Sequence, residues 1–334
     1  MRRGSIFRIS LYGLAAAGGV TLVAVLIKWL PTSASRQMDR ITWVYWFATA
    51  ICIGIFGVVA GVIVYSVLHF RAQPDDESDG PPIHGHTGLE VVWTLIPTAL
   101  VTAIAVASAV VLSQNGRAGD NPYHVKVTAQ QFAWSFQYPD DGGFRTTELV
   151  LPLRRAVRLD LSANDVIHSF WVPQFGQKQD AVPGIKTHIV VTPTRTGSFT
   201  LICTELCGLG HATMRAPVRV LPQQQFAAWV KQQKSGGGGG GSSGSATFAS
   251  AGCGSCHTFE PAGSSGKVGP DLDNLAADAK TAGKPLADYV KESIVDPDAY
   301  VVSGFQKGVM PSTYGQTLTP AQIEGLVTYL TGSK

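Results

Sequence analysis

The residues with the clearest chemical potential are soft metal ligands gathered in a short stretch of the chain. The string C-T-E-L-C-G-L-G-H-A-T-M places Cys203, Cys207, His211 and Met214 within twelve residues, and His168 lies 35 residues before Cys203. Thiolate, imidazole and thioether ligands together select a soft transition metal, and His and Cys with a weak Met are typical of copper electron-transfer sites. A mononuclear site of that kind needs one thiolate, so the second thiolate predicts two metal ions that share both sulfurs.

Three other interpretations of these residues remain open. Cys203 and Cys207 could form a disulfide bond outside the membrane. The two cysteines could instead join His168 and His211 in a zinc site, since a Cys₂His₂ ligand set is common for zinc. Met214 could be an ordinary core residue, although the chain has only four methionines. The spacing favours copper over zinc.

A second constellation lies near the C-terminus, where the chain reads C-G-S-C-H from Cys253 to His257. This is the signature of covalent c-type haem attachment: Cys253 and Cys256 would add to the haem vinyl groups, and His257 would become an axial ligand. A chance C-x-x-C-H in a zinc or redox loop is the alternative. Against it, G-P-D-L at residues 269–272 and Met310 in G-V-M-P resemble the haem-shielding turn and the distal ligand of cytochromes c. A methionine ligand raises the potential of the iron.

Composition limits the class of protein to which these sites belong. Of the 334 residues only 15% are charged and 45% are hydrophobic, whereas a soluble globular protein carries about 25% charged residues. A single soluble enzyme is therefore disfavoured, and the length allows two or three domains. The net charge of +3 provides no clustered basic face for nucleic-acid binding, and five cysteines are too few for a disulfide scaffold.

Two segments of the chain carry net charges of opposite sign. Residues 114–234 hold 13 basic and 8 acidic side chains, whereas residues 246–334 hold 6 lysines and 9 acidic side chains. Because their net charges are opposite, we expect the two segments to attract each other. Long-range attraction of this kind steers the encounter of two domains but does not define a specific interface.

Two long apolar runs precede these sites. Residues 41–70 and 91–113 contain no Lys, Arg, Asp or Glu, and each run exceeds the roughly 20 residues that a helix needs to cross the hydrocarbon. Backbone groups in lipid must be satisfied internally, so segment 35–113 is predicted to hold two transmembrane helices, at about 41–70 and 90–113. Basic residues near their ends place everything after about residue 114 on the outer side of the membrane.

The N-terminal segment 1–34 has two interpretations. Its apolar run from Leu11 to Leu30 follows three arginines and precedes the triplet Thr32-Ser33-Ala34, which is the pattern of a cleaved signal peptide. The run is longer than the usual apolar core of a signal peptide and contains Lys28. These features make an uncleaved extra transmembrane helix an equal rival to a signal peptide, and both interpretations stay open.

Beyond the membrane segments the periodicity changes. From Asn121, alternating strings such as HVKVTAQQFAWSFQY and THIVVTP predict an antiparallel β-sandwich or barrel over residues 114–234 that ends near Gln233. Residues 235–245 read SGGGGGGSSGS, the composition of a flexible linker. In the segment 246–334, Thr319 and Gln322 form a capping box before a last helix. The predicted fold class is a multidomain membrane protein with a transmembrane α-helical hairpin, a β-sandwich and an all-α domain.

The metal-ligand string and its surroundings resemble the copper A domain of cytochrome c oxidase subunit II. The resemblance covers about residues 40–222. It rests on His168, on C-x-E-x-C-x-x-x-H-x-x-M from Cys203, and on the motifs G-L-E-V-V-W-T-L-I-P (88–97), Q-Q-F-A-W-S-F-Q-Y-P (130–139) and D-A-V-P-G (180–184). It implies a cupredoxin-like sandwich in which Cys203 and Cys207 bridge two coppers. His168 and His211 would each bind one copper, and Met214 would be a weak ligand.

The resemblance also implies roles for two carboxylates and an aromatic residue. Glu205 would give its backbone carbonyl to copper, and its side chain would reach a Mg²⁺ ion shared with subunit I. Glu90, at the inner end of the second membrane helix, matches the carboxylate at the mouth of a proton channel; the alternative is a helix-start acid favoured by the macrodipole. The family usually has Trp at the surface position where electrons arrive from cytochrome c. Here Phe132 stands at that position, with Trp134 two residues further on, which argues against docking of free cytochrome c as elsewhere in the family.

Together with the haem signature, the resemblance implies a subunit II with a fused cytochrome c domain. Electrons would pass from the haem held by His257 and Met310 to copper A, and then to subunit I, which reduces O₂ to water with proton translocation. The implied partners are subunit I, subunit III and cytochrome c or a membrane-bound donor. The implied location is the bacterial inner membrane, with the copper and haem domains on its periplasmic face. No O₂-reducing site is expected in this chain, whose membrane helices offer only His69.

Three rival functions share part of this pattern. A copper A-containing nitric oxide reductase would have the same electron-accepting motifs. A quinol oxidase subunit II would keep the fold but lack the copper ligands, so it is disfavoured. The third is a non-catalytic, zinc-stabilised interaction module with an electron-carrying haem tail.

Overall fold

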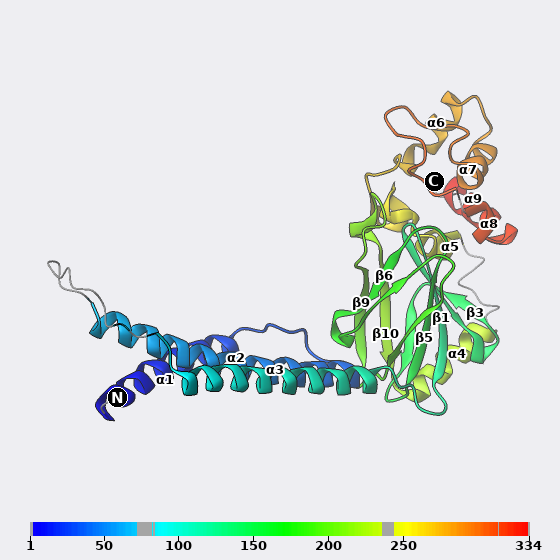
Figure 1. The fold of residues 1–334 in the computed structure, drawn as a ribbon. Coiled ribbons are helices and arrows are strands. Elements are labelled where there is room, and N and C mark those ends of the chain that lie inside the picture. Colours follow the sequence, from blue (N-terminus) through cyan, green and yellow to red (C-terminus); the bar gives the residue numbers. More distant parts are fainter. Residues whose placement is uncertain (1–2, 72–81, 83, 236–243, 313, 333–334) are drawn as a thin grey trace. The chain divides into compact units, whose positions relative to one another are not determined.

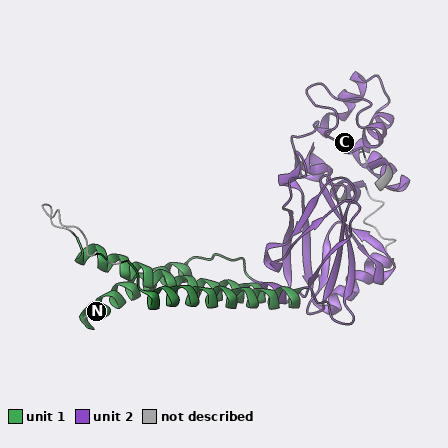
Figure 2. Ribbon diagram, in the orientation of Figure 1, with its two compact units in different colours: residues 1–32, 39–115 green, residues 33–38, 116–334 purple. Residues whose placement is uncertain are grey.

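The computed structural model describes residues 3–71, 82, 84–235, 244–312 and 314–332. The chain divides into two compact units (Figure 2). One unit holds residues 1–32 and 39–115, and the other holds residues 33–38 and 116–334. Most of the predicted linker 235–245 lies outside the described residues.

The first unit consists of three long helices (Figure 1). Each of α1 (Arg3–Leu26), α2 (Arg36–His69) and α3 (Thr87–Asn115) is long and apolar enough to cross a membrane. α2 starts before the first apolar run, and α3 extends beyond the second at both ends. Most of their large apolar side chains are exposed, as expected of surfaces that face lipid or other membrane helices.

The second unit begins with a sandwich of two five-stranded sheets. The strand orders are β3-β2-β1-β5-β8 and β4-β10-β9-β6-β7. Most neighbours are antiparallel, as predicted, but β1 pairs with β5 and β4 with β10 in parallel. Side chains alternate in the same way in both kinds of strand, so the sequence pattern could not reveal these two pairs. The strands are β1 (Tyr123–Gln130), β2 (Ala133–Tyr138), β3 (Phe144–Thr146), β4 (Leu149–Pro152), β5 (Val157–Ala163), β6 (His168–Trp171), β7 (Lys178–Ala181), β8 (Thr187–Val191), β9 (Gly197–Cys203) and β10 (Arg215–Leu221).

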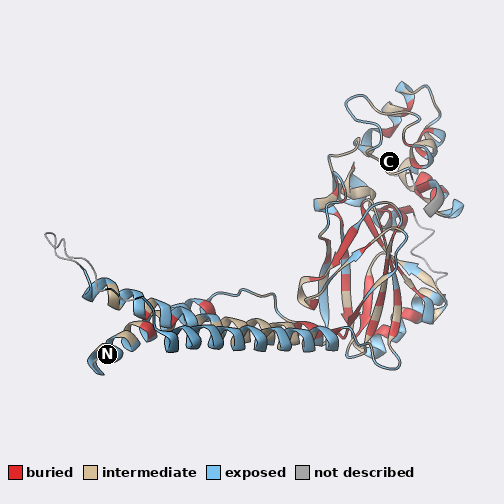
Figure 3. Ribbon diagram, viewed as in Figure 1, coloured by how far each residue is buried: buried red, intermediate tan, exposed pale blue. Residues whose placement is uncertain are grey.

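The core of the sandwich lies between its sheets, where the buried residues alternate along the strands (Figure 3). Every second residue of β5 is buried, because successive side chains of a strand point to opposite faces. Tyr138 on β2 links one sheet to the other. Its hydroxyl donates a hydrogen bond to the carbonyl oxygen of Val150 on β4 at 3.1 Å and accepts one from the Val150 N–H at 2.8 Å.

A helix that the sequence analysis did not predict packs against the sandwich. α4 (Gln223–Ser235) follows β10 and places Phe226 and Val230 in the sandwich core. The two residues are four apart, so they lie on one face of the helix. Trp229 of the same helix meets Tyr138 with 5.1 Å between ring centroids.

The C-terminal domain is helical, as predicted, and has its own core. A Cβ on Gly244 would collide with the backbone of Gly325, so the first and last helices of this domain approach closely there. Thr319 and Gln322 form the predicted capping box: the Thr319 N–H donates to Gln322 Oε1 at 2.9 Å, and the Gln322 N–H donates to Thr319 Oγ1 at 3.3 Å. The elements are α5 (Gly244–Ser250), β11 (Thr258–Phe259), β12 (Ser264–Ser265), α6 (Leu275–Thr281), α7 (Leu286–Val295), α8 (Tyr314–Thr317) and α9 (Pro320–Gly332).

Replacing Tyr138 by Phe should destabilise the sandwich. The change leaves the buried N–H and C=O of Val150 without the Tyr138 hydroxyl, and a buried unsatisfied polar group costs about 1–3 kcal/mol. Chemical denaturation of the purified full chain, followed by circular dichroism, should show a loss of that size in the free energy of unfolding. Tyr45→Phe in α2 is the control, because among the described residues the side-chain hydrogen bond at Tyr45 uses its carbonyl oxygen and not its hydroxyl. Equal stability of the two variants would contradict the role of Tyr138.

Candidate functional site

Strand pairing brings the predicted metal ligands together. His168 is the first residue of β6 and Cys203 is the last residue of β9, and these two strands pair antiparallel. The start of one strand therefore lies beside the end of the other. Cys207, His211 and Met214 follow on the loop that joins β9 to β10. The end of that loop lies beside its beginning, because the Cys203 N–H donates a hydrogen bond to the Met214 carbonyl oxygen at 3.1 Å.

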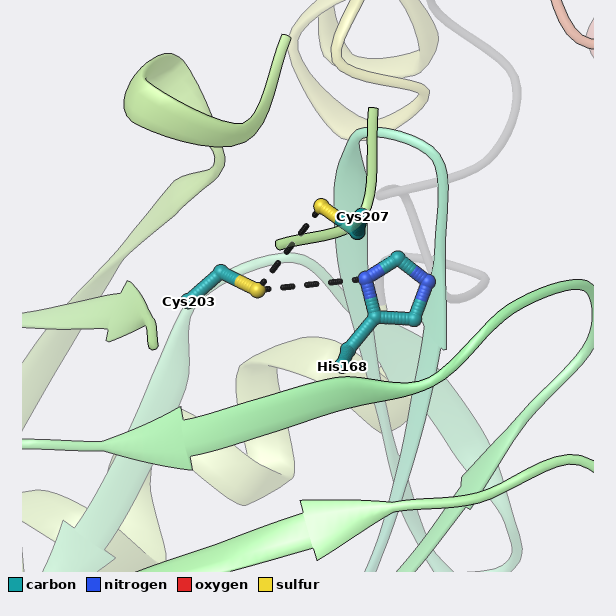
Figure 4. A group of neighbouring side chains, drawn as sticks. All are labelled: His168, Cys203 and Cys207. Atoms are coloured by element: carbon teal, nitrogen blue, oxygen red, sulfur yellow. Dashed lines mark hydrogen bonds between the residues drawn. The ribbon is translucent and has the colours of Figure 1, made fainter. Parts of the chain in front are cut away.

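Figure 4 shows His168, Cys203 and Cys207 turned toward one another, with dashed lines from the Cys203 sulfur to the Cys207 sulfur and to the His168 ring. Cys203 Sγ lies 3.8 Å from Cys207 Sγ, and both cysteines are free; a disulfide would require about 2.05 Å. His168 Nδ1 lies 3.9 Å from Cys203 Sγ, and His211 Nδ1 lies 3.6 Å from Cys207 Sγ. Each cysteine sulfur therefore lies beside a ring nitrogen of a different histidine.

Two weaker donors complete the set. Met214 Sδ lies 3.8 Å from Cys207 Sγ, and the Glu205 carbonyl oxygen lies 3.3 Å from Cys203 Sγ. Met214 is fully buried and belongs to the sandwich core, yet its sulfur also faces the thiols. A Cys₂His₂ zinc site would use four donors and leave the thioether and the carbonyl without a role. Two copper ions that share both thiolates would use all six donors, and thioether and thiolate are ligands that suit copper.

A carboxylate that the sequence analysis did not single out orients His168. Asp165 Oδ1 lies 2.9 Å from His168 Nε2, and the carboxylate also accepts hydrogen bonds from the N–H groups of Gln131 and Val166, both at 2.7 Å. Burial raises the pKa of Asp165, but the hydrogen bonds from His168 and Gln131 outweigh it and hold the pKa below its usual value. An ionised Asp165 accepts the Nε2–H and leaves Nδ1 free to bind a metal. The sequence contains one signal that could have pointed to Asp165: it is an acidic residue three positions before His168, in N-D-V-I-H.

The two thiols ionise unequally. Burial alone raises the pKa of Cys203, but hydrogen bonds with His168 and with the backbone at Ser169 lower it. The pKa of Cys207 is raised by burial and by the nearby charge of Cys203. Two buried thiolates at this distance repel each other, so a bound cation would stabilise the doubly ionised pair.

The two aromatic residues expected on the electron path are both buried. Phe132 is 5% exposed and Trp134 is 2% exposed, and part of the cover over Phe132 comes from Gly252 of the helical domain. Phe132 packs against the loop that joins β9 to β10, here called the metal-ligand loop. A Cβ on Gly210 of this loop would lie 2.5 Å from the Phe132 ring. The Trp134 ring meets the His168 ring edge to face, with 6.2 Å between centroids.

The helical domain encloses an apolar cavity where the sequence predicts haem. All four predicted haem residues line it. Apolar side chains supply much of the remaining wall, as a flat hydrophobic macrocycle requires. The four are Cys253, Cys256, His257 and Met310, and their apolar neighbours include Val268, Leu272, Leu275, Val290 and Leu326.

His257 is held with one ring nitrogen available. Its Nδ1–H donates to the Pro270 carbonyl oxygen at 2.7 Å, which leaves Nε2 for a metal. A Cβ on Gly269 would collide with the imidazole ring. Burial lowers the pKa of His257, although the bond to Pro270 opposes this, so the ligating neutral form is favoured.

The two carboxylates with implied roles have exposed side chains. Glu205 turns only its carbonyl oxygen to the thiols. Glu90 lies in the first turn of α3, and its Oε1 accepts a hydrogen bond from the His86 N–H at 3.1 Å. This contact explains why an acid begins the helix and does not conflict with a role in proton uptake.

Comparisons with known proteins cover most of the chain. Family models match at residues 24–111 (cytochrome c oxidase subunit II, transmembrane domain), 145–221 (cytochrome c oxidase subunit II, periplasmic domain) and 242–334 (cytochrome c). Cytochrome c oxidase subunit 2 of Bacillus sp. (strain PS3) is 33% identical over 79% of this chain and 80% of its own length. The subunit 2 of Alkalihalophilus pseudofirmus is 29% identical over 91% of each chain. A crystal structure of the periplasmic domain of subunit II from Bradyrhizobium japonicum is 33% identical and covers 36% of this chain and 98% of its own, with a TM-score of 0.34.

Replacing Asp165 by Asn should weaken copper binding. The amide lacks the charge that supports His168, and loss of such an outer partner of a metal-binding histidine costs about 10–100-fold in affinity. Titration of the copper-loaded full chain with a competing chelator should show copper release at lower chelator concentration. Asp160→Asn is the matched control, because Asp160 pairs with Arg158 in the same domain. Unchanged copper retention in Asp165→Asn would contradict the positioning role.

Proposed function

The chain belongs to the cytochrome c oxidase subunit II family, and from this premise we propose which of its residues hold the redox centres and connect them. Within the family it is the subunit that accepts electrons in a haem–copper terminal oxidase and delivers them to subunit I. It is a membrane protein with a periplasmic domain. The family implies copper A, and the C-terminal cytochrome c domain implies haem. The relatives named above are oxidase subunits, and none is a nitric oxide reductase.

The observation that carries the proposal is the buried thiol pair with one imidazole beside each sulfur. Cys203 and Cys207 would bridge two copper ions, and His168 and His211 would each bind one of them. The sulfur of Met214 and the carbonyl oxygen of Glu205 would be the weaker ligands. Copper held in this way supplies reversible one-electron transfer. The chain keeps His168 fully shielded from water.

The haem would be held by four residues of the helical domain. Cys253 and Cys256 would attach the haem through thioether bonds, and His257 Nε2 and the Met310 sulfur would bind its iron. The Pro270 carbonyl oxygen orients the imidazole through Nδ1–H. A methionine ligand in an apolar cavity raises the reduction potential of the iron.

Phe132 is the residue that we place between the two centres. It lines the haem cavity, and its carbonyl oxygen would lie 3.2 Å from a Cβ on Gly252, the residue before Cys253. Its ring also packs on Gly210 of the metal-ligand loop. One residue therefore contacts the surroundings of both centres, which supports Phe132 as the bridge for electrons. Trp134, against His168, is the second aromatic group near copper.

The remaining parts of the proposal concern ions, protons and partners. The exposed Glu205 side chain suits a Mg²⁺ ion shared with subunit I. The exposed position of Glu90 in the first turn of α3 suits the mouth of a proton channel. Subunit III, and cytochrome c or a membrane-bound donor, would complete the assembly in a bacterial inner membrane.

Metal analysis and electron paramagnetic resonance of the purified full chain test the copper assignment. We expect a mixed-valence signal with hyperfine splitting from a pair of equivalent copper nuclei. Cys207→Ser removes one bridging sulfur and should abolish that shared signal. Cys52→Ser in α2, which alters the one cysteine outside both sites, should leave it unchanged. Zinc in the wild-type site, or an unchanged signal in Cys207→Ser, would overturn the assignment.

Replacing Phe132 by Leu should slow electron transfer from haem to copper within the chain. The smaller Leu side chain would pack less tightly against the loop that joins β9 to β10. Electron tunnelling slows when atoms along its path are no longer in contact. Photoreduction of the haem followed by time-resolved absorbance measures the rate directly. Phe136→Leu, a similar change at a core position of β2, controls for general loosening of the sandwich. Equal rates in the two variants would exclude a special role for Phe132.

A further inference from the structure

We propose that α1 stays attached as a third membrane helix of this subunit and is not removed as a signal peptide. Two independent sets of contacts argue for this: the packing of α1 against α2, and the burial of the segment at which cleavage would occur. Neither set involves the copper or haem residues, so the inference stands apart from the proposed function.

Small residues let α1 and α2 approach backbone to backbone. A Cβ on Gly13 would lie 2.6 Å from the Gly57 carbonyl oxygen, and a Cβ on Gly61 would lie 2.5 Å from the Ile9 carbonyl oxygen. A Cβ on Gly57 would lie 3.0 Å from the Ala17 Cβ. Gly13 and Ala17 are four residues apart, as are Gly57 and Gly61, which is the spacing at which membrane helices pair through small residues. Backbone atoms cannot move aside as a flexible side chain can, so this contact depends on glycine.

A polar contact joins the same two helices. Arg8 Nη1 of α1 lies 3.0 Å from Nε2 of His69, the last residue of α2. His69 Nδ1 lies 3.0 Å from the Tyr65 carbonyl oxygen, which can only accept a hydrogen bond. The Nδ1–H therefore donates to Tyr65, and Nε2 accepts from Arg8. The one histidine of the described membrane helices thus has its partner on α1.

The predicted cleavage point is buried in the sandwich-containing unit. Ala34 is 1% exposed and Ser35 is 0% exposed. The Ala34 N–H donates to the Gln174 carbonyl oxygen at 2.9 Å, and the Ala34 carbonyl oxygen accepts from the Thr194 N–H at 2.9 Å. Ser35 Oγ donates to the Phe175 carbonyl oxygen at 3.0 Å. The segment 33–38 is therefore an integral part of that unit.

Cleavage after Ala34 would disrupt this packing. Hydrolysis of the Ala34–Ser35 peptide bond would consume one water and create a carboxylate on Ala34 and an ammonium group on Ser35. The new charge on Ser35 would lie where the residue is fully buried, and burying a charge without a partner is costly. The Ala34 hydrogen bonds would leave with the released segment. An uncut chain keeps all of these contacts.

A retained α1 changes what this subunit contributes to the membrane. The subunit supplies three helices, and the Gly57–Gly61 face of α2 is covered by its own chain. The matched transmembrane family model begins at residue 24, so most of α1 lies outside the part of the chain that the model describes.

Peptide mapping of the subunit purified from membranes tests retention directly. Trypsin cuts after Lys28 and Arg36, so an uncut chain yields the peptide WLPTSASR, which spans the Ala34–Ser35 bond. We expect this peptide in the same amount as peptides from the sandwich, together with an intact mass that includes α1. A chain that begins at Ser35, or at any residue beyond Gly13, would overturn the proposal.

A pair of glycine variants tests the packing. Gly13→Leu would collide with α2, whereas Gly18→Leu on the same helix has no atom within 4 Å of its Cβ. We expect the helical circular dichroism signal of Gly13→Leu to melt at a lower temperature than that of wild type, and Gly18→Leu to match wild type. Equal melting of all three proteins would refute the contact between α1 and α2. If Gly13→Leu cannot be produced, the peptide map of the wild type still decides the question of retention.

Discussion

The close approach of two buried thiols is the constraint on which the rest of the structure depends. Cys203 Sγ and Cys207 Sγ lie 3.8 Å apart, and the residues are 3% and 4% exposed, so ionising both without a cation nearby is costly. The pairing of β6 with β9 places His168 beside this pair, and the bond from Cys203 to the Met214 carbonyl returns the ligand loop to it. Hydrogen bonds of the sandwich backbone therefore bring the ligand residues together around the two thiols.

At both proposed redox sites a histidine ring is oriented by a hydrogen bond through one of its nitrogens, but the partners differ. His168 is held by the carboxylate of Asp165 through Nε2, and His257 is held by the neutral carbonyl of Pro270 through Nδ1. A carboxylate partner makes an imidazole a stronger donor than a carbonyl partner does. If His168 binds copper as proposed, it gains charge support in a site with two thiolates. The proposed haem ligand, His257, is favoured in its neutral form in an apolar cavity.

Short contiguous sequence motifs were enough to predict the family and the fold class. The features that the sequence did not reveal depend on contacts between segments that are far apart in the chain. The ligand spacing around Cys203 and the C-G-S-C-H string are contiguous, so the family and the fold class could be inferred from them. Asp165, the helix α4 and the parallel pairing of β1 with β5 depend on which segments meet in space. The contact of Phe132 with Gly252 of the helical domain also joins segments that are far apart in the sequence. The fate of residues 1–34 likewise depends on contacts of Gly13 and Ala34 with residues far along the chain.

The central claim is that Cys203 and Cys207 bridge two copper ions, and copper-edge X-ray absorption on the purified full chain tests it most directly. The account predicts sulfur and nitrogen neighbours around copper together with a second copper as a close scatterer. In Cys207→Ser the copper–copper contribution should disappear while the haem spectrum remains. A single copper with no copper neighbour, or absorption at the zinc edge instead, would contradict the account.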